Sequence, residues 1–175
     1  MIYEYFGSKE ALYKRVLEDV YGRLGECETF LTAHPDEIDA VEAVRTLVPA
    51  YFAFLKDNPT YVRMVMWENI HEARYFDEQQ LAGVRNPIKR TMKEIIRKGQ
   101  EEGRFRSDVD DSQFLLSLFA CCFNYFSNIH TMTRVMNADL STDEQMQQRI
   151  VDITNMLLAH LLLPPTDLTA DTGNG

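Results

Sequence analysis

The chain has 175 residues, of which 45% are hydrophobic and 26% are charged, and its formal net charge is −9. Such a length and composition predict one folded domain with a sizeable core and exclude disorder over most of the chain. Because nucleic acids are bound mainly through Lys and Arg, the acidic balance opposes DNA binding by the chain as a whole.

The termini and the cysteines show no sign of export or of membrane insertion. The longest apolar run near the C-terminus, 156–163, is far shorter than the roughly 20 residues that a membrane span requires. The N-terminus lacks the basic and apolar regions of a signal peptide. Cys27, Cys121 and Cys122 are an odd number of cysteines, and two of them are adjacent, so we expect reduced thiols. These features predict a cytoplasmic protein that does not contact a membrane.

Helical spacing of apolar residues runs through almost the whole chain, and no stretch alternates strictly enough to predict a sheet. Ser8 is placed to cap a first helix. A second helix is expected over about 38–56, with a kink at Pro49, which has no N–H to donate. The pairs 58–59 and 86–87, both Asn-Pro, are expected to begin two further helices, because proline is tolerated at a first helical position. The predicted fold class is all-α.

The stretch 75–85 is compatible with a loop, a short helix or the first half of a kinked helix. Two long helices are then expected over about 111–136 and 142–163. The first is apolar on nearly all sides and the second carries two apolar stripes, which is more than the middle helices of one chain can cover. We therefore expect a homodimer with a four-helix interface. The candidate interface residues are Phe114, Leu118, Tyr125, Ile150, Leu157, Leu158, Leu161 and Leu162.

The N-terminal run 2–12, Ile-Tyr-Glu-Tyr-Phe-Gly-Ser-Lys-Glu-Ala-Leu, resembles the junction that follows the recognition helix in tetracycline-repressor (TetR) regulators. A looser resemblance covers 99–110, which is similar to the family's connection into its two dimerisation helices. The resemblance implies a homodimer that binds operator DNA through a helix-turn-helix and binds a small effector in its helical domain. It also implies that most of the helix-turn-helix would lie before Met1, which would account for the acidic balance.

The resemblance further implies which residues contact the DNA backbone. In such regulators these are aromatic residues at the end of the recognition helix and the Lys that opens the next helix. The matching positions are Tyr3, Tyr5 and Lys9. Hydroxyls and an ammonium group at a helix N-terminus suit phosphate oxygens and fix register without reading bases. Packing between helices for the tyrosines, and a solvated position for Lys9, remain the alternatives.

The same resemblance sets the expected domain organisation. Residues 1–8 would be the remnant of the recognition helix and its turn. Residues 9–163 would form the ligand-binding and dimerisation domain. Residues 164–175 are rich in Pro, Thr, Asp, Gly and Asn, and this composition predicts a disordered tail.

Soft and aromatic side chains in the middle of the chain are the candidates for an effector pocket. Such side chains beside a few polar groups can line a pocket for an apolar ligand, although they also serve as ordinary core. The resemblance favours the pocket and a small, largely apolar effector. The candidates are Phe52, Met64, Trp67, His71, Met92, Phe119, Phe123, Phe126 and His130, with Met66, Phe76, Asn69 and Asn124 in the same group.

Nothing in the sequence supports an enzyme. It has no Gly-rich phosphate loop and no nucleophile elbow, and no cofactor is expected. Glu68 and His71 have the Glu-x-x-His spacing of di-iron bundles, but no other His follows a Glu by three residues, so no metal is expected.

The leading hypothesis is a ligand-responsive TetR-type regulator, and specifically a repressor. The alternatives are a helical small-molecule-binding module that has lost DNA binding and, more weakly, a metal-dependent helical enzyme.

Overall fold

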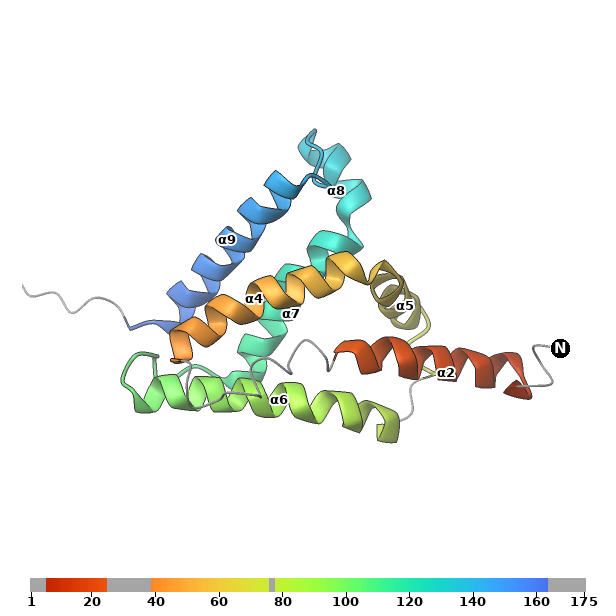
Figure 1. Cartoon of the computed structure of the whole chain (residues 1–175), viewed down its shortest axis with the longest axis horizontal. Helices are drawn as coiled ribbons and strands as arrows, with labels where there is room; N and C mark the ends of the chain where they lie inside the picture. The colour runs from red at the N-terminus through yellow and green to blue at the C-terminus, as the bar shows by residue number, and fades with distance from the viewer. Residues whose placement is uncertain (1–5, 25–38, 76–77, 164–175) are drawn as a thin grey trace, which may run out of the picture.

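In the computed structural model, residues 6–24, 39–75 and 78–163 are described. Every regular element in these ranges is a helix, and the only β-type pairing there is one isolated bridge between Phe105 and Leu162. The all-α prediction is therefore confirmed. The helices are α2 (Lys9–Gly22), α4 (Ala40–Asp57), α5 (Pro59–Ile70), α6 (Glu78–Glu101), α7 (Asp111–Ser127), α8 (Ile129–Met136) and α9 (Asp143–Leu161) (Figure 1).

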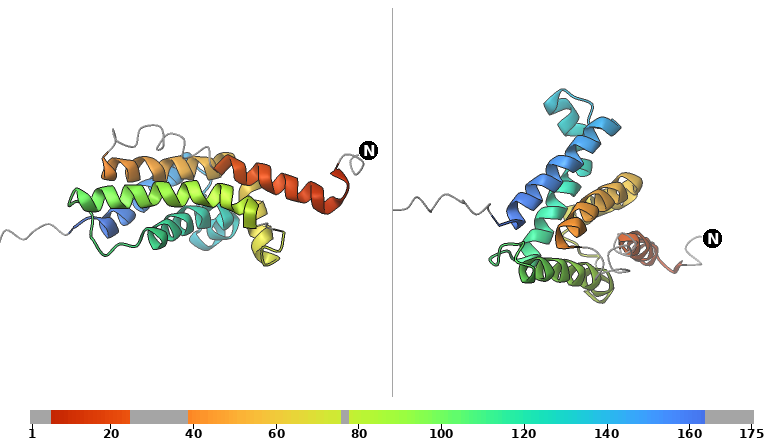
Figure 2. Two further views of the ribbon diagram at one scale, coloured as in Figure 1. Left: turned by 90° about the horizontal axis from the view of Figure 1, so that it is seen from below. Right: turned by 60° about the vertical axis from the view of Figure 1, so that its left-hand side comes forward.

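The helices are arranged around α4 and α7. α4 packs against α7, α9, α6 and α5, and α7 also contacts α5, α6 and α9. α2 rests on α5 and α6 and extends beyond the rest of the molecule at its N-terminal end (Figures 1 and 2). None of the helices in the described ranges combines the length and the apolar character that crossing a membrane requires.

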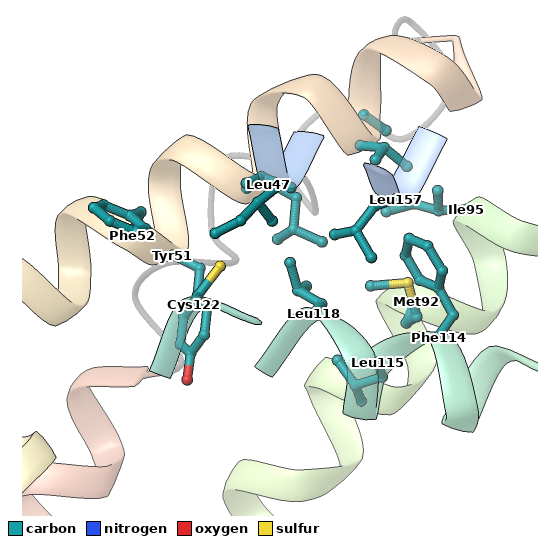
Figure 3. Packing of buried hydrophobic residues seen from close by; sticks show 14 of the residues in the cluster. Leu47, Tyr51, Phe52, Met92, Ile95, Phe114, Leu115, Leu118, Cys122 and Leu157 are labelled. Atoms are coloured by element: carbon teal, nitrogen blue, oxygen red, sulfur yellow. The ribbon is translucent and has the colours of Figure 1, made fainter. Parts of the chain in front are cut away.

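The core is built from the inward faces of four helices. Val44, Val48 and Phe52 recur every four residues along α4, so they lie on one face, and all three are fully buried. Phe114 and Leu118 approach that face from α7 in the same way. Figure 3 shows how side chains of α4, α6, α7 and α9 converge there. Burying one such side chain stabilises the fold by about 1.5–3 kcal/mol.

Polar side chains cap the starts of α2 and α4. Ser8 is confirmed as the cap of α2, because its hydroxyl accepts a hydrogen bond from the Ala11 amide at 3.0 Å. α4 begins after Asp39, whose carboxylate accepts from the amides of Val41 and Glu42 at 2.8 and 2.9 Å. Local sequence therefore sets where these helices begin.

Two predicted helix boundaries are different in the structure. The helix expected to begin at Pro87 begins at Glu78, so the undecided stretch before Pro87 is largely the first part of α6. The single helix expected over 111–136 is divided at Asn128 into α7 and α8. The Asn128 amide group donates to the backbone and side-chain oxygens of Asn124 at 3.3 and 2.8 Å, and such side-chain bonds favour a helix end. Pro49 lies inside the continuous helix α4.

The connection between α6 and α7 is fastened to the end of α9. The Arg106 amide donates to the Leu161 carbonyl at 2.8 Å, and the Leu163 amide donates to the Arg104 carbonyl at 3.2 Å. Between these bonds the Phe105 ring packs against Gly99, where an added Cβ would lie 2.1 Å from the ring. Gly99 is therefore required by a close approach, and this contact holds α6, α7 and α9 together.

Candidate functional site

The N-terminal residues expected to contact phosphate are only partly within the described ranges. Tyr3 and Tyr5 lie outside the described residues. Lys9 is the exposed first residue of α2. It follows a turn in which Gly7 adopts a left-handed φ of 77°, a conformation that favours glycine. The ammonium group thus stands at a helix N-terminus, and its contact with phosphate stays a prediction.

An open apolar groove of about 560 Å³ lies between α4, α5 and α7. Tyr51 of α4 forms its base and packs against Phe119 of α7, with ring centroids 5.0 Å apart. Helix α5 forms one wall and helix α7 the other. The lining residues are Tyr51, Tyr61, Val65, Met66, Asn69, Ile70, Leu116, Phe119, Ala120 and Phe123.

The groove is suited to an apolar molecule with few polar groups. Its walls are aliphatic, aromatic and thioether side chains, and no lining residue carries a charge. The polar groups on the lining are two tyrosine hydroxyls and the carboxamide of Asn69, whose amino group donates to the Val65 carbonyl at 2.8 Å. Apolar walls with a few hydrogen-bonding groups are the usual composition of a small-molecule site.

Phe119 and Phe123, two of the predicted pocket residues, lie on the groove. Phe52 and Met92 are instead fully buried in the core. Phe52 contacts the rings of Tyr125 and Phe126 at centroid distances of 5.2 and 4.7 Å, and Met64 and Phe126 pack against the same core from partly buried positions. These four side chains belong to or pack on the core and do not line the groove.

Three other pocket candidates lie nearer the surface. The Trp67 side chain is 51% exposed, and its ring lies 4.3 Å from that of His71. The Nδ1 atom of His71 is 2.8 Å from the Trp67 carbonyl oxygen. His130 is exposed on α8. None of the three lines the groove.

Several groove residues were not selected from the sequence. Tyr51, Tyr61 and Val65 were absent from the pocket candidates, as were Leu116 and Ala120. The spacing of Tyr61, Val65 and Asn69 by four residues along one helix face was the available signal. Spacing alone does not tell a face that lines a groove from one that enters the core.

Most of the predicted dimer-interface residues lie inside the chain's own core. Phe114, Leu118, Tyr125, Leu157, Leu158 and Leu161 are buried within a single chain. Ile150 and Leu162 are partly buried and pack against the same core. The middle helices cover these faces, so a partner cannot reach them without opening the fold.

Other apolar residues of α7, α8 and α9 do reach the surface. Leu116 of α7 is 61% exposed, and Val151 and Met156 of α9 are 43% and 49% exposed. α8 exposes Val135 and Met136 as well. Exposed apolar side chains on these helices are available for contact with another protein.

A polar junction joins α2 to α5 on the other side of the groove wall. The Tyr13 hydroxyl of α2 donates to Oε1 of Glu68 at 2.5 Å. The Tyr13 ring contacts the Tyr75 ring at a centroid distance of 5.1 Å. Burial, and then the bond to Glu68, raise the pKa of Tyr13, so its hydroxyl stays protonated and donates. These contacts fix α2 against α5 at one position.

The structure gives no basis for metal or thiol chemistry in the part of the chain it describes. No group of three His, Cys, Asp or Glu side chains there could hold a metal ion. Burial raises the pKa of the Cys122 thiol to about 12, which makes that thiol unreactive, and Cys121 is half-buried beside it. Cys27 lies outside the described residues. Glu68 and His71 are engaged with Tyr13 and with the α5 backbone instead.

Comparison with known proteins gives two findings. Residues 41–157 match a protein family described as tetracyclin repressor-like, C-terminal domain. A curated relative, the HTH-type transcriptional repressor NicS of Pseudomonas putida, is 30% identical over 162 residues, which cover 92% of this chain and 76% of the relative.

Proposed function

Because the chain belongs to the tetracycline-repressor (TetR) family of transcription regulators, we propose that it is the effector-binding and dimerisation part of a cytoplasmic, ligand-responsive repressor. Regulators of this family are transcription factors and not enzymes. The relative named NicS is a repressor, which supports the same sign of regulation here. The effector would be a small, largely apolar molecule.

The groove between α4, α5 and α7 carries this proposal. It combines apolar walls with hydroxyl and carboxamide groups, and one of its walls is the helix that holds α2. α2 follows the segment similar to the end of a recognition helix, and Lys9 at its start would contact phosphate together with Tyr3 and Tyr5. A molecule in the groove would thus act on the helix that adjoins the DNA-binding head.

The proposed dimer pairs α7 and α9 of one chain with those of a second copy. Leu116, Val151 and Met156 would enter the interface in place of the buried residues expected from the sequence. Two-fold pairing would place the DNA-binding heads of the two chains on operator half-sites that lie roughly 34 Å, or a multiple of that distance, apart. An effector that binds one head spacing better would shift the population by a coupling of about 1–3 kcal/mol.

Operator binding is tested with the full-length gene product and the promoter region of its own gene in a mobility-shift assay. We expect a specific complex that a small apolar effector, found by thermal-shift screening, dissociates. The variant Ala120→Trp fills the groove and should lose the effector's thermal shift. Lys93→Trp, on the exposed face of α6, is the control and should respond normally. Absence of any sequence-specific complex would refute the proposal.

The dimer is tested by gel filtration with light scattering. The parent chain should run as a dimer at micromolar concentration, and Val151→Glu should run as a folded monomer because a charge is then buried without a partner. Trp67→Glu changes an equally exposed apolar residue on α5 and should remain dimeric. A monomeric parent chain would contradict the interface.

A further inference from the structure

Tyr13 binds α2 to the effector domain by a directional contact. Its hydroxyl donates to Glu68 of α5, and its ring packs against Tyr75, just beyond the end of α5. Between them the chain turns back through Glu72 and Ala73, both at left-handed φ values of 58° and 56°. Non-glycine residues adopt this conformation at an energetic cost, so the surrounding contacts must hold the turn in place.

Helix α5 contacts both the groove and α2. Val65, Met66 and Asn69 line the groove, whereas Glu68 is not part of the lining and reaches Tyr13 of α2. α5 packs against both α2 and α7. An α-helix of twelve residues moves as a stiff body, because each turn is hydrogen-bonded to the next. A displacement of α5 at the groove therefore displaces Glu68 as well.

Burying Glu68 carries an energetic cost that a purely structural position does not require. Its side chain is 1% exposed, and its Oε2 atom has no hydrogen-bond partner within the described part of the chain. A buried carboxylate with unsatisfied bonding capacity destabilises a fold, and an apolar residue of similar size would pack there at lower cost. The bond to the Tyr13 hydroxyl is what a carboxylate contributes here and an apolar residue cannot.

We propose that Glu68 is a positioning residue that transmits occupancy of the groove to α2 through the Tyr13 hydroxyl. Filling the groove pushes α5 away from α7, Glu68 moves with it, and the bond that holds Tyr13 bends or breaks. α2 then changes its angle to the body. The inference rests on the proposed effector response, but the link itself is a property of the described helices.

The strength of the link is measured by amide hydrogen exchange of α2 in the chain, with no DNA and no effector. Tyr13→Phe removes the hydroxyl and keeps the ring against Tyr75. The α2 amides should then exchange about tenfold faster, as expected for loss of a hydrogen bond to a charged group. Tyr125→Phe is the control, because the Tyr125 hydroxyl donates to the Leu140 carbonyl at 2.6 Å without touching α2. It should leave α2 exchange unchanged relative to the rest of the chain.

Transmission is measured with a groove-filling substitution as the stand-in for a ligand. Ala120→Phe, on the α7 wall, should change α2 exchange severalfold in the parent and in the Tyr125→Phe background, and should have no effect on it in the Tyr13→Phe or Glu68→Leu backgrounds. Glu68→Gln keeps an acceptor oxygen for Tyr13 and should restore the response. A purely structural role for Glu68 would not make the response depend on the acceptor.

Two results would overturn the inference. One is an α2 amide exchange rate that Ala120→Phe leaves unchanged in the parent chain. The other is a response of equal size with and without the Tyr13 hydroxyl, which would place the path elsewhere, for example at the contact between Tyr21 of α2 and the groove residue Tyr61, whose ring centroids are 5.3 Å apart. Because no operator is used, loss of the proposed DNA binding would leave this test intact, and failure here would leave the operator assay intact.

Discussion

The core of α4, α7 and α9 and the junction between α2 and α5 are held by different kinds of contact. The core consists of fully buried apolar side chains such as Phe52, Phe114 and Leu161. α2 also buries Leu17 and Val20, and its junction with α5 adds tyrosine rings and one buried carboxylate. Apolar packing is strong and non-directional, whereas a single hydrogen bond is lost when its geometry changes. The difference indicates that the core maintains the fold and that the junction is the part able to switch.

The largest effect is expected from a cavity in the core. Phe52→Ala should lower the free energy of unfolding by about 3–5 kcal/mol, because the ring is fully buried against Tyr125 and Phe126. Urea denaturation followed by circular dichroism measures this loss. Trp67→Ala, at a half-exposed ring on α5, is the control and should cost far less. Equal losses for the two variants would break the distinction between the core and the α5 side.

A second prediction concerns the close approach of Gly99 and Phe105. Gly99→Ala places a Cβ 2.1 Å from the Phe105 ring, so the ring must leave its site, at a cost of about 1–3 kcal/mol. Gly22→Ala is the control, because a Cβ there meets nothing within 4 Å, and alanine favours a helix by about 0.5–1 kcal/mol. A thermal melt of both variants should therefore show opposite signs. A stabilised Gly99→Ala would show that the connection is not tightly packed.

The third prediction compares two tyrosine hydroxyls directly. Tyr125→Phe removes a bond to the Leu140 carbonyl inside the body and should lower the free energy of unfolding by about 1 kcal/mol. Tyr13→Phe should lower it less, because α2 can open locally while the core stays folded. Denaturant titrations monitored by the near-ultraviolet signal compare the two. A larger loss for Tyr13→Phe would make the junction part of the global folding unit.

The fourth prediction concerns the exposed start of α4. The amide hydrogen bonds from Glu42 and Val41 hold the pKa of Asp39 below its usual value of 3.8. A lowered folded-state pKa means that the cap stabilises the chain above the unfolded pKa and is lost as the pH falls through the lowered value. Asp39→Ala should cost about 0.5–2 kcal/mol at neutral pH and should flatten the stability profile near pH 3. The parent and the variant losing stability in parallel over that range would contradict this role.

The sequence alone determined the features that depend on neighbouring residues. The cap at Ser8 and the all-α class follow from a side chain within four positions of the helix start and from apolar spacing of one turn. The family likewise followed from a short contiguous run, and the comparisons bear it out. The end of α7 at Asn128 was not predicted, because apolar spacing continues through it while a local side-chain bond ends the helix.

Only the tertiary structure decided which faces are inside. α7 is apolar on nearly all sides, so the spacing of its apolar residues does not indicate which face is buried. Residues predicted for a dimer interface fill the chain's own core. The groove likewise depends on where α5 meets α7. The bond between Tyr13 and Glu68 joins residues 55 positions apart, and the ring of Phe105 selects Gly99 by contact. Such pairings are set by how whole helices pack, and packing is a property of the assembled fold and not of any local run of residues.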